Sequence, residues 1–209
     1  MMSLPADFVY LKDIDPTIIQ DVKYFNHDNF IGRAIKGYAA AECILTKKAA
    51  LALSILQRSL LAKQLSLKVF DCYRPQMAVD DFLRWTKNVN DQKMKAVYYP
   101  NIDKADFFKL GYLAERSSHS RGSTVDLTLV HLSHHNKEII DMAMGTPFDF
   151  MDERSHVISP VISDEEQKNR LLLNNLMQQA GFNPYDKEWW HFTLQNEPYP
   201  DTYFNFPII

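Results

Sequence analysis

The sequence predicts a single α+β domain, in which helices flank a mostly antiparallel central sheet. The chain has 209 residues, of which 46% are hydrophobic, and this is enough for one sizeable core but marginal for two. We therefore assign residues 1–209 to one domain. Helical and strand-like segments also follow one another without the regular alternation that is typical of a parallel sheet. One strand-like segment, residues 124–130, carries polar residues on a single face, and we expect a functional site on the sheet there.

The predicted helices are read from composition, capping residues and stop signals. Residues 42–64 are rich in Ala and Leu and contain no Gly or Pro, which favours a long, largely buried helix. Pro75 suits the first turn of a helix over about 77–85. The segment "NIDKADFFKLGY" predicts a short helix that ends at Gly111. Ser163 and Glu166 have capping-box spacing and predict a helix that ends at Gly181.

The predicted strands are read from alternation of apolar and polar residues. Residues 65–73 alternate and deliver Arg74 at the end of a strand. Residues 124–130 alternate between apolar residues and a polar face of Thr124, Asp126 and Thr128, which predicts a half-buried strand. The segment "EWWHFTL", residues 188–194, predicts a final strand. The Pro-rich tail after it is expected to wrap irregularly over the core.

Charge, hydropathy and cysteine content exclude several classes of protein. Lys and Arg number 23 against 26 Asp and Glu, so no basic surplus favours nucleic acid as a partner. No stretch approaches the roughly 18 apolar residues of a membrane span, and the first residues do not resemble a signal peptide. Two cysteines, Cys43 and Cys72, are too few for a disulfide scaffold, so we expect free, buried thiols in a reducing compartment. The expected location is the cytoplasm.

A candidate metal site is suggested by residues 117–130, "SSHSRGSTVDLTLV". His119 precedes Asp126 by seven positions, with Asp126 on the polar face of the predicted strand. This pair alone fits a salt bridge or a surface feature as well as a metal site, since catalytic zinc takes about three protein ligands and a water. His191 in "KEWWHF" is a candidate third ligand, although a histidine there also fits a hydrogen-bonded core residue. We expect one zinc ion per chain.

Two further residues complete a candidate hydrolytic centre. Residues three apart on a regular strand face opposite ways, so Glu188 and His191 can share a site only if Glu188 lies in the turn before the strand. Glu188 would then serve as the general base. Arg74 is a fixed cation suited to stabilising an oxyanion. A second cluster, His131, His134 and His135, is interpreted as a solvated hairpin turn because no carboxylate stands in convincing register.

Five motifs occur along the chain in the order "YRP", "SSHSRGSTVDLTL", "GTPFDFMDERSH", "EWWHF" and "EPYPDTYFNFP". Because of these motifs, the chain closely resembles the zinc-dependent D-alanyl-D-alanine dipeptidases. The resemblance covers nearly the whole chain. It implies zinc ligands at His119, Asp126 and His191, a catalytic base at Glu188 and a catalytic arginine at Arg74. It also implies substrate-binding residues, which are Tyr24, Ser117 and Asp149, the last of these for the substrate ammonium.

Two positions depart from the pattern that the resemblance implies. Thr124 stands where a small apolar residue is expected, and its hydroxyl is placed to bond near Asp126. Cys72 stands where glycine is expected. Neither change removes a ligand or the base. The sequence assigns no role to Arg154 or His156.

The expected substrate is a free dipeptide, which is a zwitterion and needs an anion for its ammonium and donors for its carboxylate. Without the resemblance, Asp149 would be interpreted as a structural acid in a turn, beside Asp152, Glu153 and Arg154. Two alternatives stay open: a zinc D,D-carboxypeptidase or L,D-peptidase acting on peptidoglycan peptides, and a zinc-binding module without activity. The sequence does not decide between glycopeptide resistance and dipeptide recycling, the tolerance for D-Ala-D-Ser, or the oligomeric state.

Overall fold

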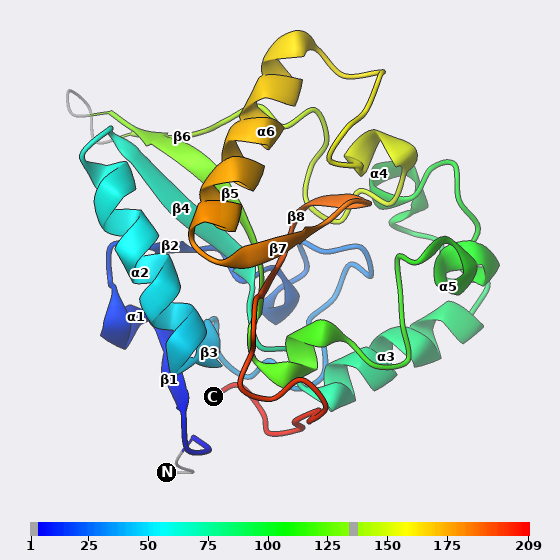
Figure 1. Ribbon diagram of the computed structural model, residues 1–209. Coiled ribbons are helices and arrows are strands. Elements are labelled where there is room, and N and C mark those ends of the chain that lie inside the picture. The colour runs from blue at the N-terminus through cyan, green and yellow to red at the C-terminus, as the bar shows by residue number, and fades with distance from the viewer. Residues whose placement is uncertain (1–3, 134–137) are drawn as a thin grey trace.

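The computed structural model describes residues 4–133 and 138–209, and it confirms the predicted α+β fold. The main sheet has the strand order β2-β4-β5-β8-β7, with β6 paired to β5 beside this path (Figure 1). Only β2 and β4 pair in parallel, and the other pairs are antiparallel. The strands are β2 (Ile19–Gln20), β4 (Leu65–Asp71), β5 (Thr124–Leu132), β6 (Ile139–Asp141), β7 (Phe182–Tyr185) and β8 (Glu188–Leu194).

Two long helices pack on the sheet, and three other helices lie together at one end of the molecule. α2 (Lys47–Leu61) packs against β4, and α6 (Asp164–Gln179) packs against β7 and β8. The smaller helices α3 (Gln76–Lys87), α4 (Lys95–Tyr98) and α5 (Phe107–Leu110) gather at the right of Figure 1. The remaining helix, α1 (Leu11–Ile14), lies beside α2. None of the helices within the described ranges is long and apolar enough to cross a membrane.

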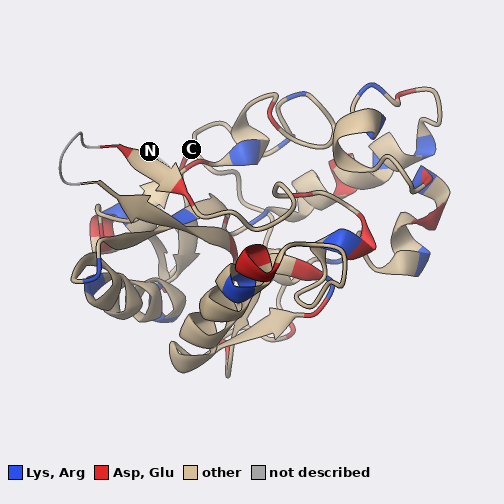
Figure 2. Cartoon of the chain, turned by 90° about the horizontal axis from the view of Figure 1, so that it is seen from above, with Lys and Arg blue, Asp and Glu red and all other residues tan. Residues whose placement is uncertain are grey.

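The capping signals in the sequence predicted helix ends well. The side chains of Ser163 and Glu166 form both hydrogen bonds of a capping box at the start of α6. Gly111 ends α5 with a φ of +86°, a conformation that glycine adopts without strain. Acidic and basic residues are interspersed along the chain, in keeping with its near-neutral balance (Figure 2).

The predicted start of the long helix at residue 42 was wrong. Ile44–Thr46 forms strand β3, which pairs antiparallel with β1 (Phe8–Tyr10), and the helix begins only at Lys47. The partner strand β1 lies more than 30 residues earlier in the chain, so local composition gave no sign of the pairing. Pairing with β1 outweighs the helix propensity of the neighbouring alanines.

Strand β5 was also predicted as half-buried, and this was wrong. Residues 124–130 are all buried, on both faces of the strand. The strand lies between β4 and β8 in the middle of the sheet, so the polar face that alternation revealed is turned into the molecule. Polar residues on a buried strand face need partners there, which makes this face the place to look for a site.

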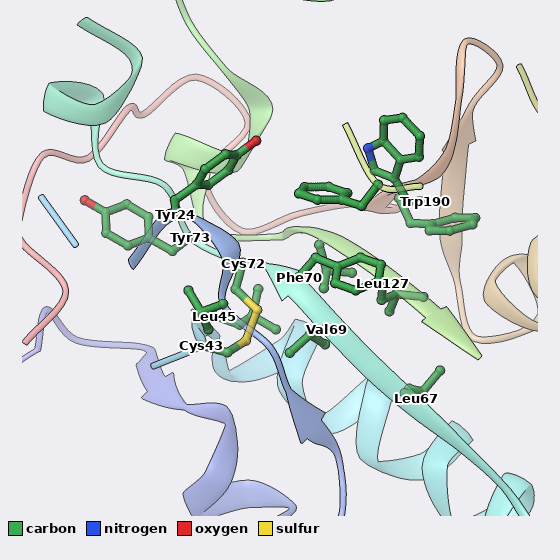
Figure 3. Close-up of a cluster of buried hydrophobic side chains, with 14 of the residues drawn as sticks. Tyr24, Cys43, Leu45, Leu67, Val69, Phe70, Cys72, Tyr73, Leu127 and Trp190 are labelled. Carbon is green, nitrogen blue, oxygen red and sulfur yellow. A yellow bond between two sulfur atoms is a disulfide. The ribbon is translucent and has the colours of Figure 1, made fainter. Parts of the chain in front are cut away.

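The prediction of free cysteines was wrong, because Cys43 and Cys72 form a disulfide (Figure 3). The bond joins the residue before β3 to the residue after β4, and both cysteines are buried, at 0% and 2% exposed. The two residues are 29 positions apart, and only the folded sheet brings them together. The argument for a reducing compartment that rested on free thiols therefore fails.

Removing this disulfide should lower the stability of the protein. For a loop of this length, the loss of cross-linking corresponds to about 3–4 kcal/mol of unfolding free energy in the chain-entropy model. Urea unfolding of the Cys43→Ala/Cys72→Ala protein, compared with the wild type, measures this change. The wild type unfolded with a dithiol reductant is the control, since it loses the cross-link without changing a side chain. Equal midpoints in all three experiments would show that the bond does not form.

Candidate metal centre and active site

Three side chains from separate elements meet at the sheet. His119 lies on a 3₁₀ turn, Ser118–Arg121, while Asp126 is on β5 and His191 is on β8. Asp126 and His191 stand directly opposite each other in the register of these strands. Each imidazole places one nitrogen 3.2 Å from a carboxylate oxygen of Asp126, and these two nitrogens, Nε2 of His119 and Nδ1 of His191, lie 3.3 Å apart.

The local sequence explains how His119 is presented. The hydroxyl of Ser117 accepts a hydrogen bond from the backbone N–H of His119 at 3.2 Å and so caps the turn. Gly122 then ends the turn with a φ of +83°, and a Cβ at this position would come within 2.3 Å of the ring of Phe8. Glycine is thus required both by the backbone conformation and by the packing. The chain leaves this turn directly into β5, which carries Asp126.

The three side chains fit a zinc ion. The two imidazole nitrogens face different oxygens of Asp126, Oδ2 for His119 and Oδ1 for His191. One ligand atom from each of the three residues lies within 4.8 Å of the others, which is close enough for the three to share one metal ion such as zinc. One oxygen of Asp126, Oδ1, is buried without a hydrogen-bond partner among the described residues, although buried polar atoms are normally satisfied. Burial raises the pKa of this carboxyl group, but His119 and His191 outweigh that effect and hold the pKa below its usual value, so an anion faces the two imidazoles.

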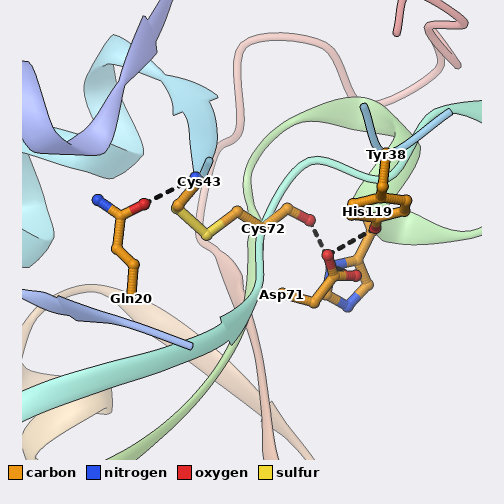
Figure 4. Close-up of a disulfide and its surroundings, with 6 residues drawn as sticks. All are labelled: Gln20, Tyr38, Cys43, Asp71, Cys72 and His119. Carbon is orange, nitrogen blue, oxygen red and sulfur yellow. Dashed lines mark hydrogen bonds and ion pairs between the residues drawn. A yellow bond between two sulfur atoms is a disulfide. The ribbon is translucent and has the colours of Figure 1, made fainter. Parts of the chain in front are cut away.

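The outer contacts of His119 leave one ring nitrogen available to a metal. Its Nδ1 lies 2.7 Å from the backbone carbonyl oxygen of Cys72, which accepts a hydrogen bond when Nδ1 carries the proton. The carboxylate of Asp71 lies 3.6 Å from the same nitrogen (Figure 4). Metal-ligating histidines usually donate in this way to a carbonyl or a carboxylate. Nε2 then has the lone pair that can bind a metal, and it points toward Asp126.

Arg74 is fixed beside the three donors by buried acids. Its Nε donates to Asp71 at 2.8 Å, and a terminal nitrogen lies 3.4 Å from Asp126. Its guanidinium group also lies 5.0 Å from the centre of the Tyr24 ring. Burial alone would lower the pKa of Arg74, but Tyr24 and Asp71 raise it well above its usual value, so the residue remains a cation.

Sequence analysis missed the importance of Asp71. This carboxylate is fully buried and accepts hydrogen bonds from Arg74 and, at 2.6 Å, from the hydroxyl of Tyr38 (Figure 4). Its position three residues before Arg74 in "DCYRP" was the available signal. The register of β4 against β5 also sets Asp71 opposite Asp126, which the sequence alone does not show.

Glu188 lies at the start of β8, immediately after the turn formed by residues 186 and 187. A shift in the pairing of β7 with β8 falls between Pro184 and Tyr185, where Tyr185 pairs with Glu188. This irregularity lets Glu188 approach within 3.6 Å of His191, which a regular strand would not allow. The side chain is 15% exposed, and its burial raises the pKa of Glu188 to about 8.

Asp149 and Tyr24 form a buried pair near the donors. The hydroxyl of Tyr24 donates to Asp149 at 2.8 Å, and Asp149 has a φ of +60°, which is uncommon for a residue other than glycine. Burial, followed by the negative charge of Asp126, raises the pKa of Asp149 well above its usual value. A buried acid held in a strained conformation is typical of functional sites.

All eight residues singled out by sequence analysis line one cavity of about 370 Å³. They are Tyr24, Arg74, Ser117, His119, Asp126, Asp149, Glu188 and His191. Aromatic and apolar side chains close much of the remaining wall, including Phe30, Phe82, Tyr112, Met151 and Trp190. A cavity of this size suits a small molecule.

The expectation for Thr124 differs from the structure, and the other positions that the sequence left without a role lie away from the site. The hydroxyl of Thr124 does not bond Asp126 but pairs with Thr193 across β5 and β8 at 2.9 Å. Arg154 is paired with Asp152, away from the donors, and neither it nor His156 lines the site cavity. His131 lies exposed on β5, whereas His134 and His135 lie outside the described residues.

The fold and the site together define an α+β domain with a two-histidine, one-carboxylate donor set at the floor of a small cavity. Residues 5–209 match the model of the Peptidase_M15 family, described as D-ala-D-ala dipeptidase, and the chain belongs to this family.

Curated relatives cover nearly the whole chain. A protein of Enterococcus faecalis is 46% identical over 96% of this chain and 98% of its own, and one of Streptomyces coelicolor is 44% identical over 98% and 100%. A protein of Escherichia coli is 38% identical over 95% of this chain and 91% of its own. All three are named D-alanyl-D-alanine dipeptidase.

Proposed function

We propose that the protein hydrolyses the free dipeptide D-Ala-D-Ala to two molecules of D-alanine, with one zinc ion held by His119, Asp126 and His191. The observation that carries the proposal is the set of three possible metal ligands within 4.8 Å of one another, which share one small cavity with Glu188 and Arg74. The family membership and the names of the relatives support the substrate.

The proposed reaction breaks the peptide C–N bond and adds water across it. A zinc ion, when bound, supplies Lewis-acid polarisation and water activation. Glu188 accepts the proton of the attacking water on its carboxylate and then donates a proton to the departing amine nitrogen. Its position 3.6 Å from His191 places the carboxylate beside the proposed ligands, where it can serve in both steps.

Arg74 is proposed to stabilise negative charge that develops on the carbonyl oxygen of the substrate. The side chain is held by Asp71 and by the Tyr24 ring, so it needs little reorganisation during the reaction. A fixed cation of this kind acts most strongly in a cavity that excludes water.

Asp149 is proposed to bind the substrate ammonium group. Without a cation, this buried acid takes up a proton readily, as its raised pKa indicates, and an ammonium group would favour the charged form. A peptide acylated at its amino group would leave Asp149 without this partner, which costs roughly 1–3 kcal/mol or more. The same pocket therefore selects free dipeptides over peptidoglycan chains.

The proposal is tested by measuring amine release from D-Ala-D-Ala, L-Ala-L-Ala and N-acetyl-D-Ala-D-Ala by the zinc-loaded protein. Turnover of the free D,D-dipeptide alone, abolished by a chelator, supports the dipeptidase. Cleavage of the acetylated substrate would instead indicate a carboxypeptidase. Binding of zinc without turnover of any of the three would indicate a binding module.

Replacing Asp149 by alanine should reduce hydrolysis of D-Ala-D-Ala by about 10-fold or more, because a charged hydrogen bond to the ammonium is lost. The loss should be much smaller for residual cleavage of the N-acetylated dipeptide. Values of kcat/KM for both substrates measure the effect. An equal loss on both substrates would contradict ammonium recognition and leave Asp149 a structural acid.

We also propose a cytoplasmic location and a small dipeptide as the partner, with no role in nucleic-acid or membrane binding. The near-neutral charge supports the absence of a nucleic-acid partner. The disulfide is uncommon for this compartment, but its full burial keeps it from contact with cellular thiols. Cell fractionation followed by detection of the protein tests the location, and recovery outside the cytoplasmic fraction would contradict it.

A further inference from the structure

The carboxylate of a dipeptide needs a cation, and Arg74 is poorly placed to be its only one. The guanidinium group of Arg74 is already bound to Asp71 and lies near Asp126, and its side chain is 11% exposed. Two of its nitrogens therefore already face buried acids. Three acids line the cavity, Asp126, Asp149 and Glu188, so the carboxylate of a bound dipeptide enters an environment that is largely negative.

Arg116 is the second arginine that lines this cavity. Within the described residues its guanidinium group has no acidic partner, and it lies 5.1 Å from the centre of the Tyr203 ring. The side chain is exposed, so its charge is available at the rim of the cavity. Sequence analysis did not single this residue out, because it lies between Glu115 and the serines of the histidine turn and looks like an ordinary surface charge.

The position of Arg116 is fixed relative to the donors on both sides. It directly precedes Ser117, which caps the turn that presents His119. On its other side, the backbone N–H of Phe204 donates to the carbonyl of Ser120 at 2.8 Å, which holds the neighbouring Tyr203 against the same turn. The Tyr203 ring supports the flat guanidinium group, and the terminal nitrogens are left to bind a ligand.

We propose that Arg116 binds the C-terminal carboxylate of the dipeptide at the rim of the cavity and makes the enzyme specific for a free carboxylate. The inference rests on the proposed function and deepens it. A guanidinium group matches a carboxylate with two parallel hydrogen bonds, which an amide or ester of the same dipeptide cannot accept equally well. With Asp149 at the ammonium, both ends of the zwitterion then have a partner of opposite charge.

The test compares D-Ala-D-Ala with D-alanyl-D-alaninamide in the zinc-loaded full-length protein. The amide is measured as a substrate or, where it is not cleaved, as a competitive inhibitor. Arg116→Gln should raise KM for D-Ala-D-Ala by about 10-fold, since one charged interaction is lost, and should change kcat little. The constant for the amide should stay the same, and Arg116→Lys should restore part of the affinity for the free acid.

Arg121→Gln is the matched control. Arg121 contacts the same Tyr203 ring, at 5.8 Å, but it is paired with Glu197 and does not line the cavity. This variant should keep the wild-type constants for both compounds. An Arg116→Gln protein that loses affinity equally for acid and amide, that loses only kcat, or that matches the wild type would overturn the proposal. A wild-type protein inactive on D-Ala-D-Ala would refute the proposed function before any substitution is made, and the role of Arg116 would fall with it.

Discussion

Replacing Glu188 by glutamine should lower kcat for D-Ala-D-Ala by about 10²–10⁴-fold while the protein still binds one zinc ion. Glutamine keeps the size of the side chain but cannot accept the proton of the attacking water. The donor set of His119, Asp126 and His191 is unchanged, so the metal content should remain the same. Steady-state kinetics and elemental analysis of the dialysed protein measure the two quantities separately.

The control for this experiment is Asp186→Asn. Asp186 is an exposed acid in the turn just before β8, so this substitution removes the same charge nearby without touching the cavity lining. It should leave both activity and metal content unchanged. If Glu188→Gln instead lost the metal, Glu188 would be a ligand rather than the base. Full activity in the Glu188→Gln protein would exclude both roles for Glu188.

Replacing His191 by alanine should weaken zinc binding by more than about 100-fold. Loss of a residue that only hydrogen-bonds to a metal ligand usually weakens binding by up to about 100-fold, and loss of a ligand itself should cost more. One of three protein donors disappears, and the remaining pair, Nε2 of His119 and the carboxylate of Asp126, cannot complete the site. Competition for zinc against a chromogenic chelator measures the affinity. Hydrolysis should be lost at the same time.

His27→Ala is the comparison for His191→Ala, because His27 is exposed and does not line the cavity. Circular dichroism of both variants should match the wild type, since His191 contributes its side chain to the site and its backbone to β8. Unchanged zinc affinity in His191→Ala would disprove the proposed centre.

Much of this site could be predicted because the informative residues stand in short local patterns. Alternation along 124–130 placed Asp126 on the correct strand face, and Ser163 with Glu166 placed the start of α6. The prediction that Glu188 lies in the turn before β8 was wrong, because Glu188 is the first residue of that strand, and a shift in the pairing with β7 brings it to His191 instead.

What could not be predicted depends on residues far apart in the chain. The strand at Ile44–Thr46 exists because a segment near the N-terminus pairs with it, and the disulfide exists because the ends of β3 and β4 meet. Asp71 gains its importance from the register of β4 against β5, and Arg116 from the closing of the C-terminal tail over the histidine turn. Local periodicity contains none of this information.

The direct opposition of Asp126 and His191 across β5 and β8 has a consequence for how the proposed metal ion would be bound. Backbone hydrogen bonds between the two strands fix the spacing of these donors during folding, and His119 is held by its own outer contacts. The chain therefore presents a preorganised chelate, and an arriving ion has no loop to order and little conformational entropy to overcome. Under the proposed function, we expect metal uptake to follow folding, unlike in small domains that fold only around their zinc.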